Sequence, residues 1–182
     1  NHHVVDDAGT LFALTDNRTL APLRVLAFDE ARDLALVQAV TTIPEPPPLV
    51  WDDDTTLDLG AQLVVLGYPL CSESITVTSG IFSGRRTVRG FSLLQTDAAL
   101  NPGVSGGLAV TATGSAVGLA VSGLSDRENV GFLIPASEIE TMVNAWAQVA
   151  DGKLTPTPRP TRTPTPRPTR TPTPQPTPTP QP

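Results

Sequence analysis

Short segments in which hydrophobic and polar residues alternate make up most of residues 1–154. A period of two places successive side chains on opposite faces of the backbone, which indicates β-strands. The segment at 23–28 shows this pattern, and the segment at 33–38 is predicted as a strand that is apolar on both faces. The turn-forming residues between them predict an antiparallel hairpin. Further strands are predicted at 62–66, 74–78, 80–83, 91–95, 108–111, 116–121 and 131–134. Because turn residues separate them, the spacing favours an all-β barrel or sandwich over β-α-β units.

One connector interrupts the strands. Residues 41–60 contain Pro44, the prolines at 46–48 and then the acidic run at 52–54. Proline excludes a central strand or helix here, because it removes a backbone donor and fixes φ. We therefore expect a solvated connector that runs over the surface.

A single helix is predicted at 137–150. Ser137 and Glu140 form a capping-box pattern, in which the serine hydroxyl accepts from the third amide and the glutamate reaches back. The apolar positions that follow share one helical face, which we expect to pack on the barrel. These positions are Ile139, Met142, Val143, Trp146 and Val149.

The segment at 155–182 repeats with a period of eight and is built almost entirely from Thr, Pro, Arg and Gln. Proline at nearly every second position prevents both helix and sheet, so a disordered or polyproline II tail is predicted. As a semi-rigid Thr/Pro-rich stalk it would span up to roughly 90 Å.

Charge and composition narrow the classes of partner. All 18 acidic residues precede Thr155 and four of the 12 basic residues follow it, which leaves a net charge of −10 on residues 1–154. Such an acidic body argues against nucleic acid as a partner. No segment has the length and apolar character of a membrane-spanning helix. Cys71 is the single cysteine, so no disulfide can form within the chain.

The candidate chemistry centres on Ser105, which lies among Gly103, Gly106 and Gly107 directly after an Asn-Pro turn signal. Alone, this stretch fits a Gly-rich hairpin equally well. A serine hydroxyl becomes a nucleophile when a histidine takes its proton and a carboxylate orients that histidine. Histidines at 2 and 3 and the Asp33-Leu-Ala-Leu segment supply both, in the chain order His, Asp, Ser that trypsin-like enzymes use.

The chain resembles the HtrA/Deg family of trypsin-like serine peptidases. The residues that carry the resemblance lie at 1–5, 33–36, 66–69, 77–81, 95–107 and 131–135, so it covers nearly all of residues 1–154. It implies a chymotrypsin-like double β-barrel with a first lobe at about 1–45, a second lobe at about 60–135 and the helix at 137–150. In this fold about two strands precede the histidine, so the resemblance implies an incomplete first lobe and weak or no activity for this segment alone.

The resemblance also implies roles for individual residues. His3, rather than His2, is the general base, Asp33 orients it, and Ser105 is the nucleophile. The amides of Gly103 and Ser105 form the oxyanion hole, and the Asp97 side chain braces the nucleophile loop. Trypsin carries an aspartate six residues before its serine, where this chain has Ala99. The resemblance therefore implies an apolar substrate pocket, formed by Ala99, Leu100, Phe132 and Leu133. No cofactor and no metal are expected.

Three features depart from the family pattern. Val104 stands where the family usually has Asn, which puts the resting oxyanion hole in question. The segment at 84–90 is short for a regulatory loop. A Pro-rich tail follows the peptidase part where the family usually has a PDZ domain, so neither PDZ-gated activation nor capture of C-terminal peptides is expected.

Three functions stay open at this stage. The first is a serine endopeptidase that acts on unfolded or exposed polypeptide segments. The second is a catalytically silent module that binds peptides on a cell-surface stalk, and the third is an adhesive head on a cell-wall spacer. Thr-Pro stalks and the family resemblance both indicate a bacterial, extracytoplasmic location. Family members often form trimers, so the resemblance allows this chain to form a homo-oligomer.

Overall fold

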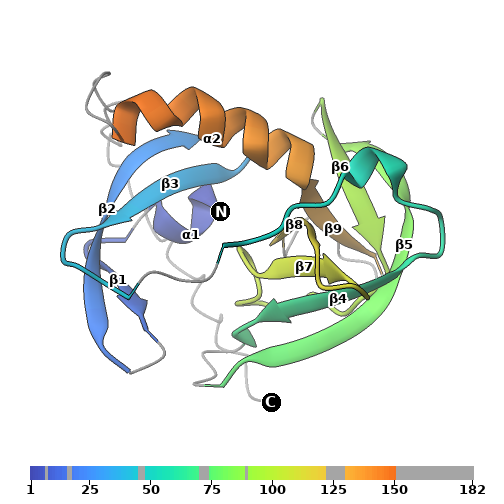
Figure 1. Ribbon diagram of the computed structural model, residues 1–182, viewed down its shortest axis with the longest axis horizontal. Helices are drawn as coiled ribbons and strands as arrows, with labels where there is room; N and C mark the ends of the chain where they lie inside the picture. Colours follow the sequence, from blue (N-terminus) through green and yellow to red (C-terminus); the bar gives the residue numbers. More distant parts are fainter. Residues whose placement is uncertain are drawn as a thin grey trace, which may run out of the picture.

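The computed structural model describes residues 1–6, 8–15, 18–44, 48–69, 74–88, 90–121 and 130–150, with side chains up to Ala147. Two antiparallel sheets form most of this part of the chain (Figure 1). The predicted stalk at 155–182 and Cys71 lie outside the described residues. Within the described residues, no helix is both long and apolar enough to cross a membrane.

The first sheet has three strands in the order β1-β2-β3 and does not close, so β1 and β3 are its edge strands. Its strands are β1 (Leu11–Leu14), β2 (Leu20–Asp29) and β3 (Leu34–Ala39). The predicted hairpin is confirmed, since β2 pairs antiparallel with β3. A register shift between Val25 and Ala27 marks a bulge in β2, and bulges bend a strand and increase its twist. We call this unit the open sheet.

The second sheet closes into a barrel in the order β4-β5-β6-β9-β8-β7. The strands are β4 (Gln62–Gly67), β5 (Thr76–Val88), β6 (Phe91–Thr96), β7 (Leu108–Thr111), β8 (Ala116–Val121) and β9 (Gly131–Pro135). Alternate residues point inward and form a core without solvent contact, with Leu63, Val65, Leu94, Ala109, Val117 and Leu133 at its centre. The predicted all-β, two-unit fold with a C-terminal helix is therefore confirmed. We call this unit the barrel.

The two strands predicted at 74–78 and 80–83 are one strand, β5, which also continues through the segment expected to be a loop at 84–88. The prediction divided this strand at Ser79 and began its second segment at Gly80. Gly80 lies in the strand and pairs with Leu63, and a Cβ at this position would overlap the backbone of Ala98. Gly80 therefore permits a close approach of two backbones and does not make a turn.

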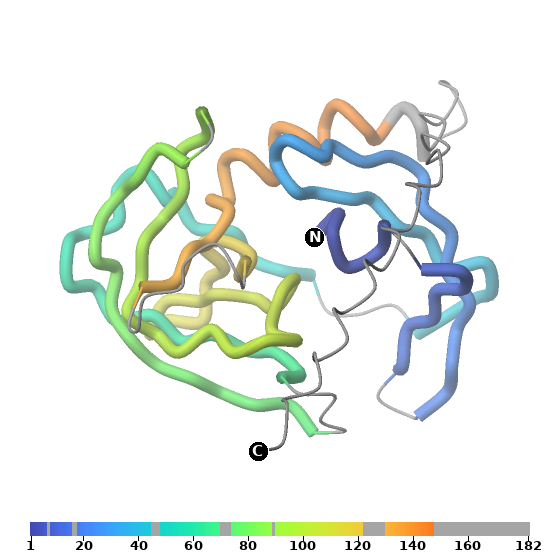
Figure 2. The backbone as a smooth tube through the Cα atoms, turned by 180° about the vertical axis from the view of Figure 1, so that it is seen from behind, coloured from blue at the N-terminus to red at the C-terminus, as the bar shows by residue number. Residues whose placement is uncertain are grey.

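A short helix, α1 (His2–Val5), lies between the open sheet and the barrel, as the front and rear views both show (Figures 1 and 2). It contacts β2 and β3. A Cβ at Gly106 would lie 3.5 Å from the backbone nitrogen of Asn1, so the start of α1 also touches the loop before β7. The chain's first residues are thus placed where the two units meet.

The sequence predicted a solvated connector between the units, but part of it is buried. It contains a 3₁₀ turn, η1 (Asp54–Thr56), and Asp54 is only 1% exposed. One carboxylate oxygen accepts from Arg85 Nη2 at 2.9 Å, and the other accepts from the Ser137 amide at 2.7 Å. A buried carboxylate needs such partners because its desolvation is costly. Asp54 therefore ties the connector to β5 and to the start of the C-terminal helix.

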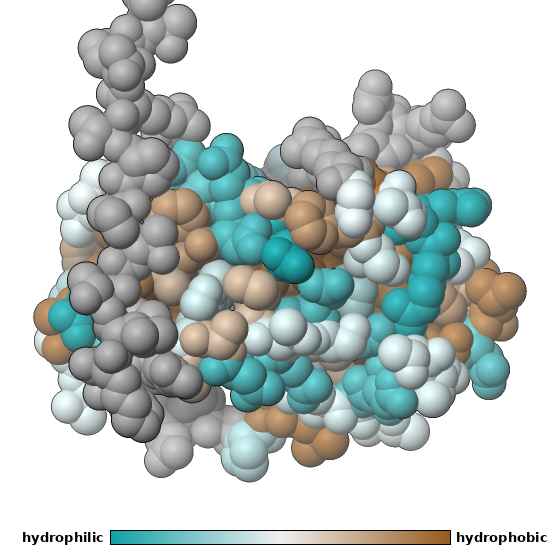
Figure 3. Space-filling model, turned by 90° about the horizontal axis from the view of Figure 1, so that it is seen from above, coloured by the Kyte–Doolittle hydropathy of each residue, from teal (hydrophilic) through white to brown (hydrophobic). Residues whose placement is uncertain are grey.

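The C-terminal helix, α2 (Ala136–Ala150), runs along the upper side of the molecule and contacts strands of both units (Figure 1). The predicted capping box is wrong: the helix begins one residue before Ser137, whose amide donates to Asp54. Ile139, Met142 and Trp146 pack as predicted, but Val143 is 47% exposed. Viewed from above, this side of the molecule mixes hydrophilic and hydrophobic residues (Figure 3).

Candidate active site

Asp33 lies at the end of the tight turn between β2 and β3, with φ of 57°. This left-handed backbone is unusual for a residue with a side chain, but aspartate adopts it more readily than most. The carbonyl of Asp33 accepts from the His2 amide at 3.0 Å and from the Asn1 side-chain amide at 3.2 Å. These bonds fasten the turn to the first residues of α1.

The carboxylate of Asp33 contacts His3 at two points. Oδ1 accepts from the His3 backbone amide at 2.8 Å, and Oδ2 lies 2.7 Å from His3 Nδ1. An ionised carboxylate can only accept hydrogen bonds, so the proton of a neutral His3 resides on Nδ1. The other ring nitrogen, Nε2, is then the basic one. The imidazole is 47% exposed, so it remains accessible at the junction of the two units.

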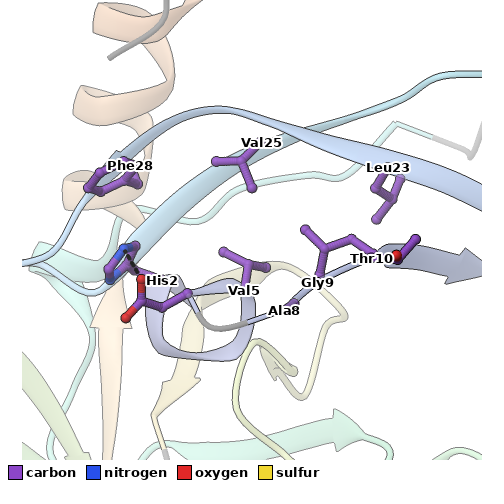
Figure 4. Close-up of a pocket in the computed structure, with 10 residues that line it drawn as sticks. His2, Val5, Ala8, Gly9, Thr10, Leu23, Val25 and Phe28 are labelled. Atoms are coloured by element: carbon purple, nitrogen blue, oxygen red, sulfur yellow. Dashed lines mark ion pairs between the residues drawn. The ribbon is translucent and has the colours of Figure 1, made fainter. Parts of the chain in front are cut away.

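His2 occupies a different environment. Its side chain is 11% exposed, and its ring stacks on Phe28 with 4.7 Å between centroids and has Nε2 3.8 Å from Asp6 Oδ1. It points into a cavity of about 330 Å³ on the open-sheet side of α1, which is otherwise lined mainly by apolar side chains (Figure 4). The two adjacent histidines therefore face different surroundings, and the two-point contact to Asp33 belongs to His3.

Ser105 follows a tight turn at 101–104. The Val104 amide donates to the Asn101 carbonyl at 3.1 Å, and Gly103 has φ of 95°. Pro102 at the second position and a left-handed glycine at the third define a type II turn. In this turn the central peptide, which carries the Gly103 N–H, is rotated by about 180° from its direction in a type I turn. The direction of that N–H therefore depends on a glycine at 103.

The neighbouring amides of the loop are bonded to backbone carbonyls. The Gly106 amide donates to Ala120 at 2.9 Å and the Gly107 amide donates to Val104 at 2.8 Å. Together with the Val104 amide, these donors are occupied and cannot hold a substrate oxygen. The Ala120 amide returns a bond to the Gly107 carbonyl at 2.8 Å, which anchors the loop to β8.

A groove of about 500 Å³ runs past this loop and brings the three sequence motifs to one place. One wall is formed by residues of α1 and β3, and the other by the end of β4 and by residues 103–108. Ser105 lines the groove, as do Val4 and Val5, which directly follow His3. The groove walls are largely apolar, with Val37, Leu66, Tyr68, Ile75 and Leu108 among them.

Comparisons with known proteins agree with this arrangement. The trypsin-like peptidase domain family matches residues 1–119, which include His3, Asp33 and Ser105. The chain belongs to the HtrA/Deg-like trypsin-fold serine peptidases.

Curated HtrA relatives and a solved structure extend this result. The serine protease Do-like HtrB of Bacillus subtilis is 32% identical over 81% of this chain and 35% of its own length. A probable periplasmic serine endoprotease, DegP-like, of Chlamydia trachomatis is 29% identical over 85% of this chain and 32% of its own length. The HtrA-type protease AlgW, solved with a decapeptide, superposes with a TM-score of 0.72 at 25% identity, over 84% of this chain and 48% of its own. The chain thus spans about a third of the length of these two curated relatives.

The substrate-pocket residues predicted from the HtrA resemblance differ in how far they are buried. Ala99 is exposed, and Leu100 is half-buried against the barrel core. Phe132 is 9% exposed, and Leu133 has no exposed surface because it faces the barrel interior. The segment at 122–129 between β8 and β9 lies outside the described residues. The assignment of the pocket therefore stays a prediction.

The loop that leads to Ser105 is braced as the sequence suggested. Asp97 Oδ1 accepts from the Ile81 amide at 2.7 Å, and Thr78 Oγ1 donates to the Ala99 carbonyl at 3.1 Å. Both contacts join the loop to β5. Sequence reasoning missed Asn1, which bonds to Asp33 and lies two residues before His3 in the same motif. Among the described residues, no three His, Cys, Asp or Glu side chains gather so that they could hold a metal ion.

Proposed function

We propose that this chain is the peptidase domain of a serine endopeptidase that hydrolyses unfolded or exposed polypeptide segments. The observation that carries the proposal is the two-point contact of His3 with Asp33, at 2.7 and 2.8 Å, beside the groove that Ser105 lines. This contact orients the imidazole and leaves Nε2 as its basic nitrogen, and we assign the Ser105 hydroxyl as the group that Nε2 deprotonates. Family membership supplies the reaction class.

The proposed reaction proceeds in two halves. Ser105 Oγ bonds to the scissile carbonyl carbon while its proton passes to His3 Nε2. Collapse of the tetrahedral intermediate breaks the carbon–nitrogen bond, and the proton on Nε2 leaves with the amine. Water then attacks the acyl-enzyme, giving its proton to Nε2, and the return of that proton to Oγ releases the acid. Asp33 stays ionised and stabilises the imidazolium in both halves.

The Gly103 and Ser105 amides are the proposed donors to the oxyanion of the intermediate. The family resemblance suggests both donors, and one finding supports Gly103: the turn at 101–104 has the type II form that depends on a glycine at this position. Donors aimed in advance at developing charge contribute strongly, with roughly 10²–10³-fold in rate for one of them.

The substrate preference follows from Ala99. Trypsin uses an aspartate at this position to hold a basic side chain, and a pocket without that charge disfavours a buried cation. We therefore propose a preference for aliphatic residues before the cleaved bond. Periplasmic DegP-like proteins are among the relatives, which supports an extracytoplasmic location.

A silent peptide-binding module is the second candidate, and Val104 is the observation that favours it. This residue is apolar and 4% exposed at a position where the family usually has Asn. The polar contact that an Asn would make in this loop is therefore replaced by packing. The module would keep the groove and lose turnover.

A fluorophosphonate probe separates the two candidates, because it bonds covalently only to an activated serine. The full-length protein should be labelled, Ser105→Ala should not, and Ser92→Ala, a change at an exposed serine on β6, should be labelled like wild type. Fluorogenic peptides with Val before the cleaved bond should turn over at least about tenfold faster than peptides with Arg there. Absence of labelling in the wild type, with intact binding of an apolar peptide, would replace the peptidase by the silent module.

A further inference from the structure

Arg32 precedes Asp33 in the turn between β2 and β3 and contacts three groups. Its Nη1 donates to Asp29 Oδ2 at 2.8 Å, and its Nε donates to Glu138 Oε2 at 3.1 Å. Its guanidinium carbon lies 4.8 Å from the centroid of the Phe91 ring. The hydrogen bonds to Asp29 and to Glu138 raise the pKa of the Arg32 guanidinium above its ordinary value.

These contacts connect the two units of the molecule. Asp29 belongs to the open sheet, Phe91 begins β6 of the barrel, and Glu138 lies in the first turn of α2. The first turn of α2 is itself held to the connector, because the Ser137 amide donates to Asp54, which also binds Arg85 of β5. Arg32 therefore fastens the turn that carries Asp33 to elements that belong to, or are anchored on, the barrel.

The proposed chemistry requires this attachment. His3 and Asp33 are attached to α1 and the open sheet, whereas the loop that carries Ser105 is bonded to β8 of the barrel. A small displacement of one unit against the other changes the distance from Nε2 to Oγ, and misplacement by about 1 Å can reduce a rate roughly 100-fold. We propose that Arg32 is a positioning residue that keeps Asp33 and His3 in register with Ser105. This inference rests on the proposed function.

A role in positioning is distinct from a role in stability. The side chains of Arg32 and Glu138 are 33% and 31% exposed, and ion pairs of this kind contribute little to the free energy of folding. Their value here is geometric, because a planar guanidinium can bond two carboxylates and stack on a ring at the same time. A lysine ammonium keeps the charge but cannot make the same set of contacts.

The test measures the rate constant for fluorophosphonate labelling of the full-length protein, together with the melting temperature. Arg32→Met should slow labelling roughly 10- to 100-fold and change the melting temperature little. Arg32→Lys should give an intermediate rate. Arg24→Met is the matched control, because Arg24 bonds to Gln38 within the open sheet at 2.7 and 3.1 Å. It should label at the wild-type rate.

Glu138→Gln and the double variant Arg32→Met/Glu138→Gln complete a double-mutant cycle for this ion pair. If Arg32 acts through Glu138, the double variant should be no slower than Arg32→Met alone. The low-field proton resonance of His3 Nδ1 gives a second readout that does not need turnover. It should broaden or shift in Arg32→Met and stay unchanged in Arg24→Met.

The two readouts keep this inference apart from the proposed function. If Arg32→Met labels at the wild-type rate, the inference is overturned while the peptidase stands. If the wild type itself is not labelled, the proposed function fails. The proton resonance then decides the inference alone: an unchanged signal in Arg32→Met overturns it, and a changed signal supports it.

Discussion

The side chain of Val104 packs directly against the backbone of Gly67 at the end of β4. A Cβ placed on Gly67 would lie 2.5 Å from Val104 Cγ2, closer than two carbon atoms can approach. Val104 is also part of the barrel core, with 4% of its surface exposed. The residue beside Ser105 is thus held by packing, and the space for it exists because position 67 has no side chain.

Substitution Gly67→Ala should therefore disturb the Ser105 loop. Overpacking of this kind costs about 1–3 kcal/mol, and part of the strain should be relieved by a shift of residues 103–106. We expect slower fluorophosphonate labelling together with a lower midpoint in urea unfolding. In the double variant with Val104→Ala, the clashing methyl group is absent, so the two changes should be less harmful together than their sum, by roughly 0.5–3 kcal/mol.

The control for this prediction is Gly9→Ala. A Cβ on Gly9 meets no atom within 4 Å, so the variant should stay within about 0.5 kcal/mol of wild type. Strictly additive effects of Gly67→Ala and Val104→Ala would contradict the contact described above.

Substitution Gly103→Ala tests the type II turn. Alanine disfavours φ of 95°, and return to a negative φ would rotate the central peptide away from its present direction. Loss of one oxyanion donor should lower kcat roughly 10²–10³-fold with little change in KM. Gly114→Ala introduces similar backbone strain at φ of 88° in the β7–β8 turn, at a cost of roughly 1–2 kcal/mol, and should keep its kcat. Equal kcat in both variants would exclude the Gly103 amide as a donor.

Substitution Asp33→Asn separates chemistry from backbone conformation. Asparagine also tolerates a left-handed φ, so the turn should be retained. An amide can accept from only one of the two His3 donors, and its NH₂ group facing Nδ1 would favour the wrong tautomer of the imidazole. We expect kcat to fall by roughly 10⁴-fold. Asp58→Asn, a change at an exposed connector residue, should leave kcat as it is, and a modest loss in Asp33→Asn would remove Asp33 from the proposed mechanism.

Substitution Asp54→Ala should destabilise the fold through the start of α2. It removes the acceptor for the Ser137 amide and the carboxylate partner of Arg85, which keeps its bond to the backbone carbonyl of residue 54. Loss of a helix cap and of a buried hydrogen-bond acceptor costs about 1–3 kcal/mol. The Arg85 side chain is 35% exposed, so water can hydrate its guanidinium and no buried unpaired charge results. Urea unfolding measures the change. Asp58→Ala, in the same connector, should have no comparable effect, and equal midpoints for the two variants would show that Asp54 does not anchor the helix.

The sequence predicted the strands well because their period-two pattern reflects burial on one face. Residues 108–111 and 116–121 were predicted with the boundaries that the structure has. The failures have local physical causes. The prediction divided β5 at Ser79, although the strand continues into Gly80, whose lack of a side chain permits a close backbone contact. Asp54 looked like part of a solvated acidic run, because its partners lie 31 and 83 residues away in the chain.

The candidate site was predictable only in part. The serine among glycines, the histidine before Val4-Val5 and the aspartate before Leu34 are local patterns, and the direct contact of His3 with Asp33 agrees with them. The contacts of Arg32 were not predictable, because Glu138 lies 106 residues away and no local pattern marks the pair. Such long-range polar contacts depend on how α2 crosses both units, which the sequence pattern does not specify.

The left-handed backbone at position 33 restricts which residues a homologous chain can carry there. Glutamate, the usual exchange for aspartate, would keep the negative charge but fit this conformation poorly, and its extra methylene would push the carboxylate past the imidazole. Asparagine and glycine would suit the backbone and lack the charge. If the proposed mechanism holds, relatives with any of these three at the equivalent position should hydrolyse peptides far more slowly than those with aspartate.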